Sequence, residues 1–293
     1  MHTTMHTTLI TAEQLQTLVQ QGAALKIFDC SFDLMKPGLG RQQYAAEHLP
    51  GAIYADLDTD LSDKRSAAAP PPASGGRHPL PDRRSVAQWL ASMGLNTGMQ
   101  VVVYDRQGSS FCGRLWWMLK WCGHEAVAVL DGGLAAWQAI GGALESGAGQ
   151  QPPSQGTFEL AAPLATLVTV EQVARELRQS QQTVIDARAE PRYRGEVEPL
   201  DPVAGHIPGA LNRPYNLNMD AQGRFRAPEE LRQEFLSLLG GREPATVVHQ
   251  CGSGVTATAN LLAMEIAGLG RAALFAGSWS QWCSDPARPV ERG

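Results

Sequence analysis

The chain repeats itself, and this internal duplication constrains its fold more than any other feature. Four short segments of the first half occur again in the second half, in the same order and with similar residue types. The matched pairs are residues 26–29 with 183–186, 48–52 with 206–210, 101–105 with 247–251, and 131–137 with 276–282. One chance match would mean little, but four in register indicate that the 293 residues hold two copies of one fold.

Each copy alternates short β-branched runs with stretches of helical periodicity. This alternation predicts an α/β fold in which a mainly parallel sheet is flanked by helices, once in each half. We expect helices over residues 12–21, 85–93, 113–121, 170–180, 229–239 and 255–267. The length fits two domains, placed here at residues 1–140 and 164–293, with a linker at 141–163 whose first part is rich in glycine and proline.

The first half contains an insertion between Ala52 and Val101, because the corresponding stretch between Ala210 and Val247 is shorter. Residues 67–81 of this insertion are rich in proline, alanine and glycine, a composition typical of irregular structure. We therefore expect the chain to make an irregular excursion there.

Composition excludes several classes of protein. Hydrophobic residues make up 43% of the chain and charged residues 18%, which is ordinary for a globular protein with a large core. The net charge of −5 argues against nucleic acid or an anionic membrane as the main partner. No apolar run approaches the ~18 residues that a membrane span requires. The start of the chain lacks the basic and apolar regions of a secretion signal.

The five cysteines are odd in number, widely spaced and free of any Cys-x-x-Cys motif. This pattern argues against a disulfide framework and against a zinc site, and we expect no metal and no other cofactor. A reducing, cytoplasmic environment fits best. Cys30, Cys112, Cys122 and Cys283 fit inert and redox-sensitive roles equally well, whereas Cys251 has a distinctive setting.

Cys251 follows an apolar run that reads as a buried strand, and it precedes a short loop of glycine and serine that leads into a helical stretch. Backbone N–H groups in such a loop, together with a helix N-terminus, stabilise a negative charge on sulfur. Gly252 and Gly254 permit the unusual backbone angles that the loop requires. Cys251 is therefore a candidate nucleophile, and a buried structural cysteine is the alternative that this segment alone leaves open.

The first half carries Asp105 where the second half carries Cys251. A carboxylate cannot act as a soft nucleophile, so we predict that the first copy is catalytically inactive. A cysteine needed only for packing would be matched by an apolar residue rather than by an aspartate. The comparison of the two copies therefore favours a reactive thiol at Cys251.

The duplication, the paired His-x-Pro-Gly-Ala segments and the loop at residues 251–257 resemble the two-domain rhodanese-like sulfurtransferases. The resemblance runs from about Leu15 to Val290. The loop is its most specific part, since Cys-Gly-Ser-Gly-Val-Thr is the form seen in the 3-mercaptopyruvate branch. The resemblance implies tandem rhodanese-like domains and a reaction in which Cys251 becomes a persulfide and passes its outer sulfur to a thiophilic acceptor.

The resemblance also implies a set of donor-binding residues in the loop. Gly252, Gly254, Val255 and Thr256 are expected to hold the sulfur and its charge through their backbone amides. Because the loop has no charged side chain, it forms a neutral cradle that suits an organic thiol better than a dianion such as thiosulfate.

The donor-binding arginine that follows the family's Asp-Ala-Arg segment corresponds to Arg192, whose guanidinium can grip a carboxylate at two points. Arg188 is expected to be structural and to pair with a carboxylate near the loop. Enzymes of the mercaptopyruvate branch usually have a second arginine in a Glu-Pro-Arg segment, but this chain has Leu200 there. The second arginine is missing from the pattern, and Arg194 is the candidate that could replace it.

In the mercaptopyruvate branch, the loop serine joins a histidine and an aspartate of the first domain in a set that handles protons. The matching residues are Ser253, His78 and Asp56, which suit protonation of a departing enolate. For His78 the alternative is a loop histidine without function, and for Asp56 a solvated carboxylate in a turn. His48 and His206 occur symmetrically in the two copies, so we expect them to serve the fold.

Two other classes of protein compete with this interpretation. A cysteine-dependent phosphatase would need an arginine at the sixth position after the nucleophile to hold a phosphate dianion, and Ala257 stands there. A non-catalytic rhodanese-like binding module would be expected to lose the cysteine in both copies, and this chain keeps Cys251. A sulfurtransferase remains the favoured class.

The choice of donor is less strongly constrained. The uncharged loop favours 3-mercaptopyruvate, because thiosulfate-preferring relatives usually carry arginine and lysine after the cysteine. Leu200 weakens that preference, so sulfur transfer from thiosulfate to cyanide is the alternative function. The acceptor could be thioredoxin, a small thiol or cyanide.

Overall fold

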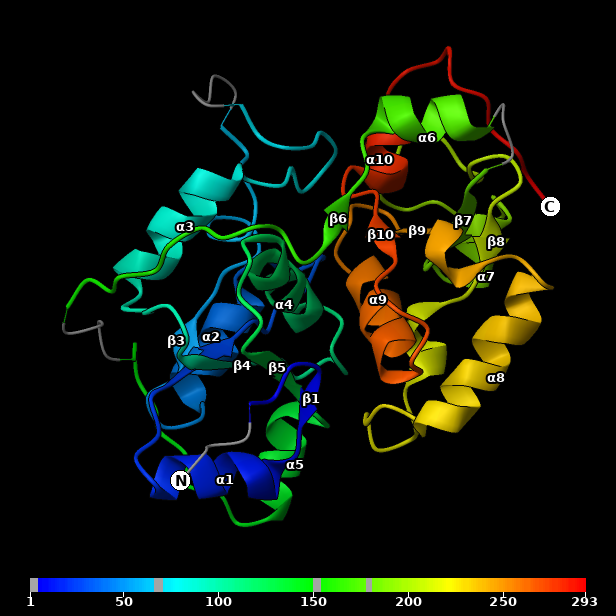
Figure 1. Ribbon diagram of the computed structural model, residues 1–293. Helices are drawn as coiled ribbons and strands as arrows, with labels where there is room; N and C mark the ends of the chain where they lie inside the picture. The colour runs from blue at the N-terminus through cyan, green and yellow to red at the C-terminus, as the bar shows by residue number, and fades with distance from the viewer. Residues whose placement is uncertain (1–4, 66–70, 150–153, 178–180) are drawn as a thin grey trace. The chain divides into compact units, whose positions relative to one another are not determined.

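The computed structural model describes residues 5–65, 71–149, 154–177 and 181–293 (Figure 1). They fall into two units, each with a five-stranded sheet in which all strands are parallel. The first unit comprises Met1–Ser62, Pro81–Leu164 and Ala221–Phe225, and the second comprises Asp63–Leu80, Ala165–Asp220 and Arg226–Gly293. The predicted α/β fold with a repeated parallel sheet is confirmed.

The sheet of the first unit has the strand order β1-β5-β4-β2-β3. Its strands are β1 (Leu9–Ile10), β2 (Leu25–Asp29), β3 (Ile53–Tyr54), β4 (Gln100–Tyr104) and β5 (Val127–Leu130). Every residue of the central strand β4 is buried, which fits a parallel strand covered on both faces.

Helices cover both faces of this sheet. They are α1 (Ala12–Gln20), α2 (Leu39–Ala46), α3 (Arg83–Ser92), α4 (Cys112–Trp121) and α5 (Gly133–Ala139). Successive side chains of a strand point to opposite faces. Ile27 of β2 belongs to the apolar cluster that also contains residues of α1, α2 and α5, whereas the neighbouring Phe28 packs against Trp89 of α3, with ring centroids 5.7 Å apart.

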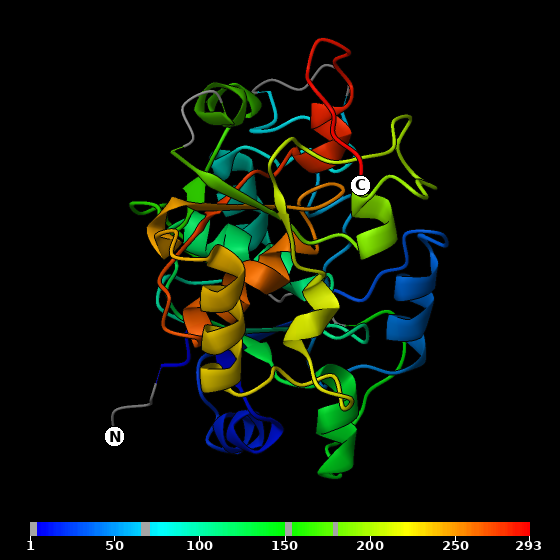
Figure 2. The ribbon, with the colours of Figure 1, turned by 90° about the vertical axis from the view of Figure 1, so that its right-hand side faces the viewer.

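The second unit repeats the same topology, with the strand order β6-β10-β9-β7-β8. Its strands are β6 (Thr166–Leu167), β7 (Thr183–Asp186), β8 (Leu211–Asn212), β9 (Val247–Gln250) and β10 (Ala273–Leu274). Its helices are α6 (Val170–Leu177), α7 (Glu190–Tyr193), α8 (Pro228–Leu239), α9 (Ala257–Ile266) and α10 (Ser278–Trp282), with short 3₁₀ turns at Tyr215–Asn218 and Pro244–Thr246. Helices α8 and α9 lie side by side in both views (Figures 1 and 2).

All six predicted helices are present, with ends that differ from the predicted ones by a few residues at most. Residues 178–180 of the helix predicted over 170–180 lie outside the described part of the chain. Helices α2, α5, α7 and α10 were missed because they span only four to eight residues, too few to show a helical period. No helix within the described residues is both long and apolar enough to cross a membrane.

The symmetric histidines serve the fold, as predicted. His48 stacks on Tyr44 with ring centroids 4.0 Å apart and contacts its carbonyl oxygen through Nδ1 at 2.7 Å. His206 repeats both contacts with Tyr193, at 3.8 Å and 2.8 Å. The same stacked and hydrogen-bonded histidine–tyrosine pair therefore stabilises the corresponding turn in each copy.

The excursion from the first half belongs to the second unit, although it precedes most of that unit in the sequence. One backbone hydrogen bond joins its two ends, from Asp63 to Pro79 at 2.8 Å, and another closes its later part, from Ala73 to Leu80 at 2.7 Å. Its far end is fastened to α10, because the Arg77 N–H donates to Ser280 Oγ at 2.9 Å. Residues 66–70, which include part of the predicted excursion at 67–81, lie outside the described residues.

The described part of the predicted linker at 141–163 is bound to the first unit by backbone hydrogen bonds. Gly156 donates to Ala91 at 2.7 Å and Ala161 donates to Cys122 at 3.1 Å. Residues 150–153 lie outside the described part of the chain. The domain boundaries placed at 140 and 164 stay predictions.

The Asp105 carboxylate fills the loop that follows β4. Its Oδ1 accepts hydrogen bonds from the N–H groups of Gln107 and Ser109, both at 2.9 Å. Its Oδ2 accepts from those of Phe111 and Cys112, also at 2.9 Å. Four backbone donors in a buried loop therefore depend on one carboxylate.

We expect Asp105→Ala to lower the free energy of unfolding of the first unit by about 2–4 kcal/mol, because it leaves buried donors without an acceptor. Asp105→Asn keeps one acceptor oxygen, so it should lower the free energy of unfolding by less than Asp105→Ala. Urea denaturation followed by circular dichroism measures the change, with the exposed Glu159→Ala as the control. Equal midpoints for Asp105→Ala and the control would contradict this reading of the loop.

Candidate active site

Cys251 stands at the carboxyl end of β9, directly before the loop that leads into α9. Its residue surface is 2% exposed. Its backbone is held at both polar groups, since its N–H donates to Ser278 Oγ at 3.1 Å and its carbonyl oxygen accepts from the Trp279 N–H at 3.0 Å. Both partners lie at the start of α10, so this short helix fixes the backbone of the candidate nucleophile.

Two glycines shape the loop for different reasons. Gly254 has a φ of +71°, and a Cβ there would lie 2.2 Å from the carbonyl oxygen of Ala276, so only glycine fits. Gly252 has an ordinary φ, but a Cβ there would lie 3.0 Å from Nη2 of Arg77 and 3.6 Å from both terminal nitrogens of Arg192. The first glycine sets the turn, and the second leaves room for two guanidinium groups.

The loop after Cys251 differs from its counterpart after Asp105 in what its amides bind. Gln107 and Ser109 donate their N–H groups to the Asp105 carboxylate. The corresponding residues, Ser253 and Val255, have no acceptor for their N–H groups among the described residues. By the correspondence of the two copies, these amides are free to stabilise a negative charge carried by the Cys251 side chain.

The structure brings His78 and Ser253 together, although they are far apart in the sequence. Nδ1 of His78 lies 2.7 Å from Oγ of Ser253. Both residues are buried and both belong to the second unit, because the excursion that carries His78 is part of it. The pair is in hydrogen-bond contact beside the loop, as a proton-handling set would require. Its catalytic role stays a prediction.

Asp56 belongs to the first unit. Its Oδ1 accepts from the Asp58 N–H at 2.9 Å, and its Oδ2 lies 3.4 Å from the exposed Arg41 guanidinium. These contacts are those of a carboxylate that shapes a turn. Its place in the proton-handling set stays a prediction.

Arg192 lies in α7 and reaches toward the Cys251 loop. Its Nη2 binds Oε1 of Glu198 at 2.6 Å, and its Nε lies 3.2 Å from Oε2 of the same carboxylate. Although burial raises the pKa of the Glu198 carboxyl, the Arg192 guanidinium and backbone N–H groups bring it below its usual value. The ionised Glu198 therefore holds Arg192 in place above Gly252.

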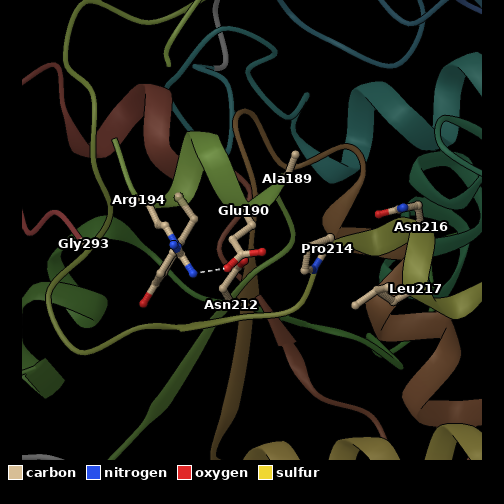
Figure 3. A pocket seen from close by; sticks show the side chains of 9 residues that line it. Ala189, Glu190, Arg194, Asn212, Pro214, Asn216, Leu217 and Gly293 are labelled. Carbon is tan, nitrogen blue, oxygen red and sulfur yellow. Dashed lines mark hydrogen bonds and ion pairs between the residues drawn. The ribbon is translucent and has the colours of Figure 1, made fainter. Parts of the chain in front are cut away.

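Arg194 lines a different surface, a pocket of about 630 Å³ that also includes Asn212, Pro214 and Leu217 (Figure 3). Its side chain is half exposed and forms ion pairs with Glu190 and Glu196. Neither partner belongs to the Cys251 loop. The role of Arg194 as a replacement for the missing arginine stays a prediction, and no described contact links it to the loop.

Arg77 is a cationic residue beside the loop that the sequence analysis missed. Its Nη1 binds Oδ1 of Asp201 at 2.5 Å, and Asp201 Oδ2 lies 3.4 Å from Nη2 of Arg192. Burial raises the pKa of the Asp201 carboxyl, while the Arg77 guanidinium acts in the opposite direction. The only sequence signal was the position of Arg77 directly before His78.

Comparison with known proteins agrees with this geometry. The model of the rhodanese-like domain matches residues 11–140 and 169–285, once in each copy. This chain belongs to the rhodanese-like family. The predicted resemblance and the predicted duplication are both confirmed.

Two proteins similar to this rhodanese-like chain carry different names. A protein of Pseudomonas aeruginosa, named as a probable 3-mercaptopyruvate sulfurtransferase, is 45% identical over 97% of this chain and 98% of its own length. A protein of Mycobacterium tuberculosis, provisionally named thiosulfate sulfurtransferase SseB, is 39% identical over 97% of both chains. The crystal structure of SseA from Escherichia coli, described among 3-mercaptopyruvate sulfotransferases, matches with a TM-score of 0.77, 32% identity, and coverage of 94% of this chain and all of SseA.

Arg188 is the buried anchor of this rhodanese-like site. Its Nη2 binds Asp186 at 2.6 Å and the carbonyl oxygen of Gly205 at 2.7 Å, and its Nη1 lies 3.3 Å from Glu198. Its guanidinium also covers the ring of Trp279 at 4.8 Å. The predicted pairing of Arg188 with a carboxylate near the loop is confirmed.

The other four cysteines of this rhodanese-like chain are buried and poorly suited to act as nucleophiles. Burial raises the pKa of the Cys30 and Cys112 thiols well above the ordinary value, and nearby aspartates add to the effect. Burial also raises the pKa of Cys122, to about 12, and that of Cys283. These thiols are protonated at neutral pH, which favours the inert alternative that the sequence left open.

His249 is a buried histidine on β9, two residues before the candidate nucleophile. Its Nε2 lies 3.0 Å from Sδ of Met264, and its Nδ1 has no hydrogen-bond partner among the described residues. Burial, together with the charge of Arg213, lowers the pKa of His249 from 6.5 to about 3. The imidazole is therefore neutral in the folded protein at neutral pH.

We expect His249 to make the second unit sensitive to acid. In the unfolded chain His249 takes up a proton below pH 6.5, whereas in the folded protein it does so only near pH 3. The free energy of unfolding therefore falls as the pH falls from 6.5 to about 3. The contribution is up to about 1.4 kcal/mol per pH unit. Urea denaturation at several pH values should show a flatter pH dependence for His249→Leu, and curves parallel to the wild type would refute the assignment.

Proposed function

We propose that this protein is a sulfurtransferase that takes sulfur from 3-mercaptopyruvate and transfers it to a thiol acceptor through a persulfide on Cys251. The observation that carries the proposal is the contrast between the two loops. The first copy satisfies its amides with the Asp105 carboxylate, whereas the second offers the Ser253 and Val255 amides to a charge at Cys251. The names of its relatives support the same reaction.

The reaction needs no oxidant and no cofactor in this scheme. The Cys251 thiolate attacks the donor sulfur, and a sulfur–sulfur bond forms as the carbon–sulfur bond of the donor breaks. The electron pair of the broken bond leaves on carbon as the enolate of pyruvate, which then takes up a proton. An acceptor thiolate attacks the outer sulfur, and the electron pair of the sulfur–sulfur bond returns to Cys251.

The loop amides stabilise the negative charge at both stages. Thiolate and persulfide are both anions, and both are stabilised by N–H groups of Gly252, Ser253, Gly254, Val255 and Thr256 that are held in place before the reaction. Ala257 follows as the first residue of α9 and is fully buried, so no guanidinium occupies the position that a phosphatase would require. The loop is therefore suited to a soft monoanion.

We assign protonation of the pyruvate enolate to the contact between His78 and Ser253. Their 2.7 Å separation allows a proton to pass between the imidazole and the hydroxyl, and burial keeps bulk water from competing. Asp56 is proposed as the third member of this set. The donor carboxylate is assigned to Arg192, which Glu198 already orients toward Gly252.

Thiosulfate is the second candidate donor. The presence of Leu200 where relatives carry a second arginine favours it, as does the name of the Mycobacterium tuberculosis relative. For the acceptor we propose a thiol, with thioredoxin as the first protein to test and cyanide as the simple chemical alternative. We also propose a cytoplasmic location, because all five cysteines are free thiols, which a reducing compartment maintains.

We expect a short treatment with 3-mercaptopyruvate to add the mass of one sulfur atom to the protein. The adduct should form on Cys251 and disappear after incubation with an acceptor thiol. Intact-mass spectrometry with peptide mapping measures it, and Cys251→Ser should give no adduct while Cys283→Ser behaves as the wild type. An adduct that still forms in Cys251→Ser would show that Cys251 is not the nucleophile.

We expect a higher kcat/KM with 3-mercaptopyruvate than with thiosulfate. Ser253→Ala, His78→Asn and Asp56→Asn should lower kcat with 3-mercaptopyruvate by about 100-fold, the scale of a lost general acid. The same variants should change the thiosulfate reaction little, because sulfite leaves without protonation at carbon. A higher kcat/KM with thiosulfate, together with unchanged kinetics in His78→Asn, would make thiosulfate the donor.

A further inference from the structure

We propose that Arg77 is the second arginine that binds the donor carboxylate, and that it determines specificity for carboxylate-bearing thiols. This inference rests on the proposed function and deepens it. The cation expected after Glu198 is absent from the sequence there, because Leu200 takes its place. The structure supplies a guanidinium from the excursion instead.

The guanidinium groups of Arg77 and Arg192 converge on one point beside Gly252. A Cβ on Gly252 would meet Nη2 of Arg77 at 3.0 Å and the terminal nitrogens of Arg192 at 3.6 Å. Two guanidinium groups from distant segments thus lie beside the residue that follows Cys251. A carboxylate bound between them would sit one residue from the nucleophile, a geometry that suits a donor whose sulfur and carboxylate are separated by only two carbons.

Arg77 and Arg192 have hydrogen-bonding capacity that their ion pairs do not use. Nε of Arg77 is buried and has no hydrogen-bond partner among the described residues. The ion pair with Asp201 engages Nη1 of Arg77, and that with Glu198 engages Nη2 and Nε of Arg192. Donors remain on both groups near Gly252, and a carboxylate of the substrate offers the acceptors that they lack.

Arg77 is held in place at both its backbone and its side chain. Its backbone N–H is fixed to Ser280, and the preceding Gly76 packs so closely that a Cβ would lie 2.6 Å from the carbonyl oxygen of Gly277. Asp201, whose side chain is 4% exposed, then contacts both Arg77 and Arg192. Asp201 is the internal counter-ion that keeps two like charges side by side until the donor arrives.

Steady-state kinetics with 3-mercaptopyruvate test the proposal in the full-length protein. Arg77→Met should raise KM by about 10- to 100-fold with a much smaller change in kcat, because it removes charged hydrogen bonds made in both the ground state and the transition state. Arg77→Lys keeps the positive charge but loses the two-point hydrogen bonding of a guanidinium, so its KM should lie between those of the wild type and Arg77→Met. The exposed Arg175→Met on α6 is the matched control and should behave as the wild type.

Two further measurements separate substrate binding from a structural role. Asp201→Asn keeps Arg77 but removes the carboxylate that positions it, so its KM should rise by less than that of Arg77→Met. With 1-mercaptopropan-2-one, in which a methyl group replaces the carboxylate, persulfide formation measured by mass should be the same in Arg77→Met and the wild type. Equal KM increases in Arg77→Met and Asp201→Asn, or equal losses with both donors, would overturn the proposal.

The outcomes also distinguish this inference from the function on which it rests. If the wild type forms no persulfide from 3-mercaptopyruvate, the proposed donor is wrong. If the wild type does so and Arg77→Met has an unchanged KM, only the role of Arg77 is wrong. Melting temperatures of all variants, measured in parallel, show whether a kinetic loss reflects unfolding.

Discussion

The hydrogen-bonding demand of the loop after the central strand governs both copies of this protein. In each unit the chain leaves β4 or β9 through a tight loop whose N–H groups need an acceptor. The first copy carries the acceptor permanently, as the Asp105 carboxylate. The second has the thiol of Cys251 at that position, and the N–H groups of Ser253 and Val255 have no acceptor among the described residues.

A chain of alternating charges connects this loop to the core of the second unit. Asp186 at the end of β7 holds Arg188, which contacts Glu198, and Glu198 in turn holds Arg192. Asp201 then links Arg192 to Arg77. Removing one residue of a buried ion pair leaves the charge of its partner uncompensated. The resulting loss of folding free energy is larger than the net stabilisation that the intact pair provides. The buried pair of Asp186 and Arg188 therefore helps to fix the positions of Arg192 and Arg77 at the more exposed end of the series.

The sequence predicted what its local patterns encode. The repeat predicted two parallel sheets and the apolar periodicity predicted the longer helices, both of which the structure contains. The contrast between Cys251 and Asp105 singled out a candidate nucleophile, which stays a prediction. Sequence-based prediction missed the short helices α7 and α10, which tertiary contacts rather than propensity stabilise. It also missed Arg77, because nothing local shows that an irregular segment of the first half folds with the second unit and contacts Asp201.

The assignment of Asp63–Leu80 to the second unit has a consequence for how such a protein can evolve. A fragment containing only the second repeat would keep Cys251 and its loop but lose His78 and Arg77, which contact Ser253 and Asp201. The first repeat therefore encodes part of the second unit, including residues that contact Ser253 and Asp201. Removal of the first half of the chain would also remove contacts that are made within the second unit.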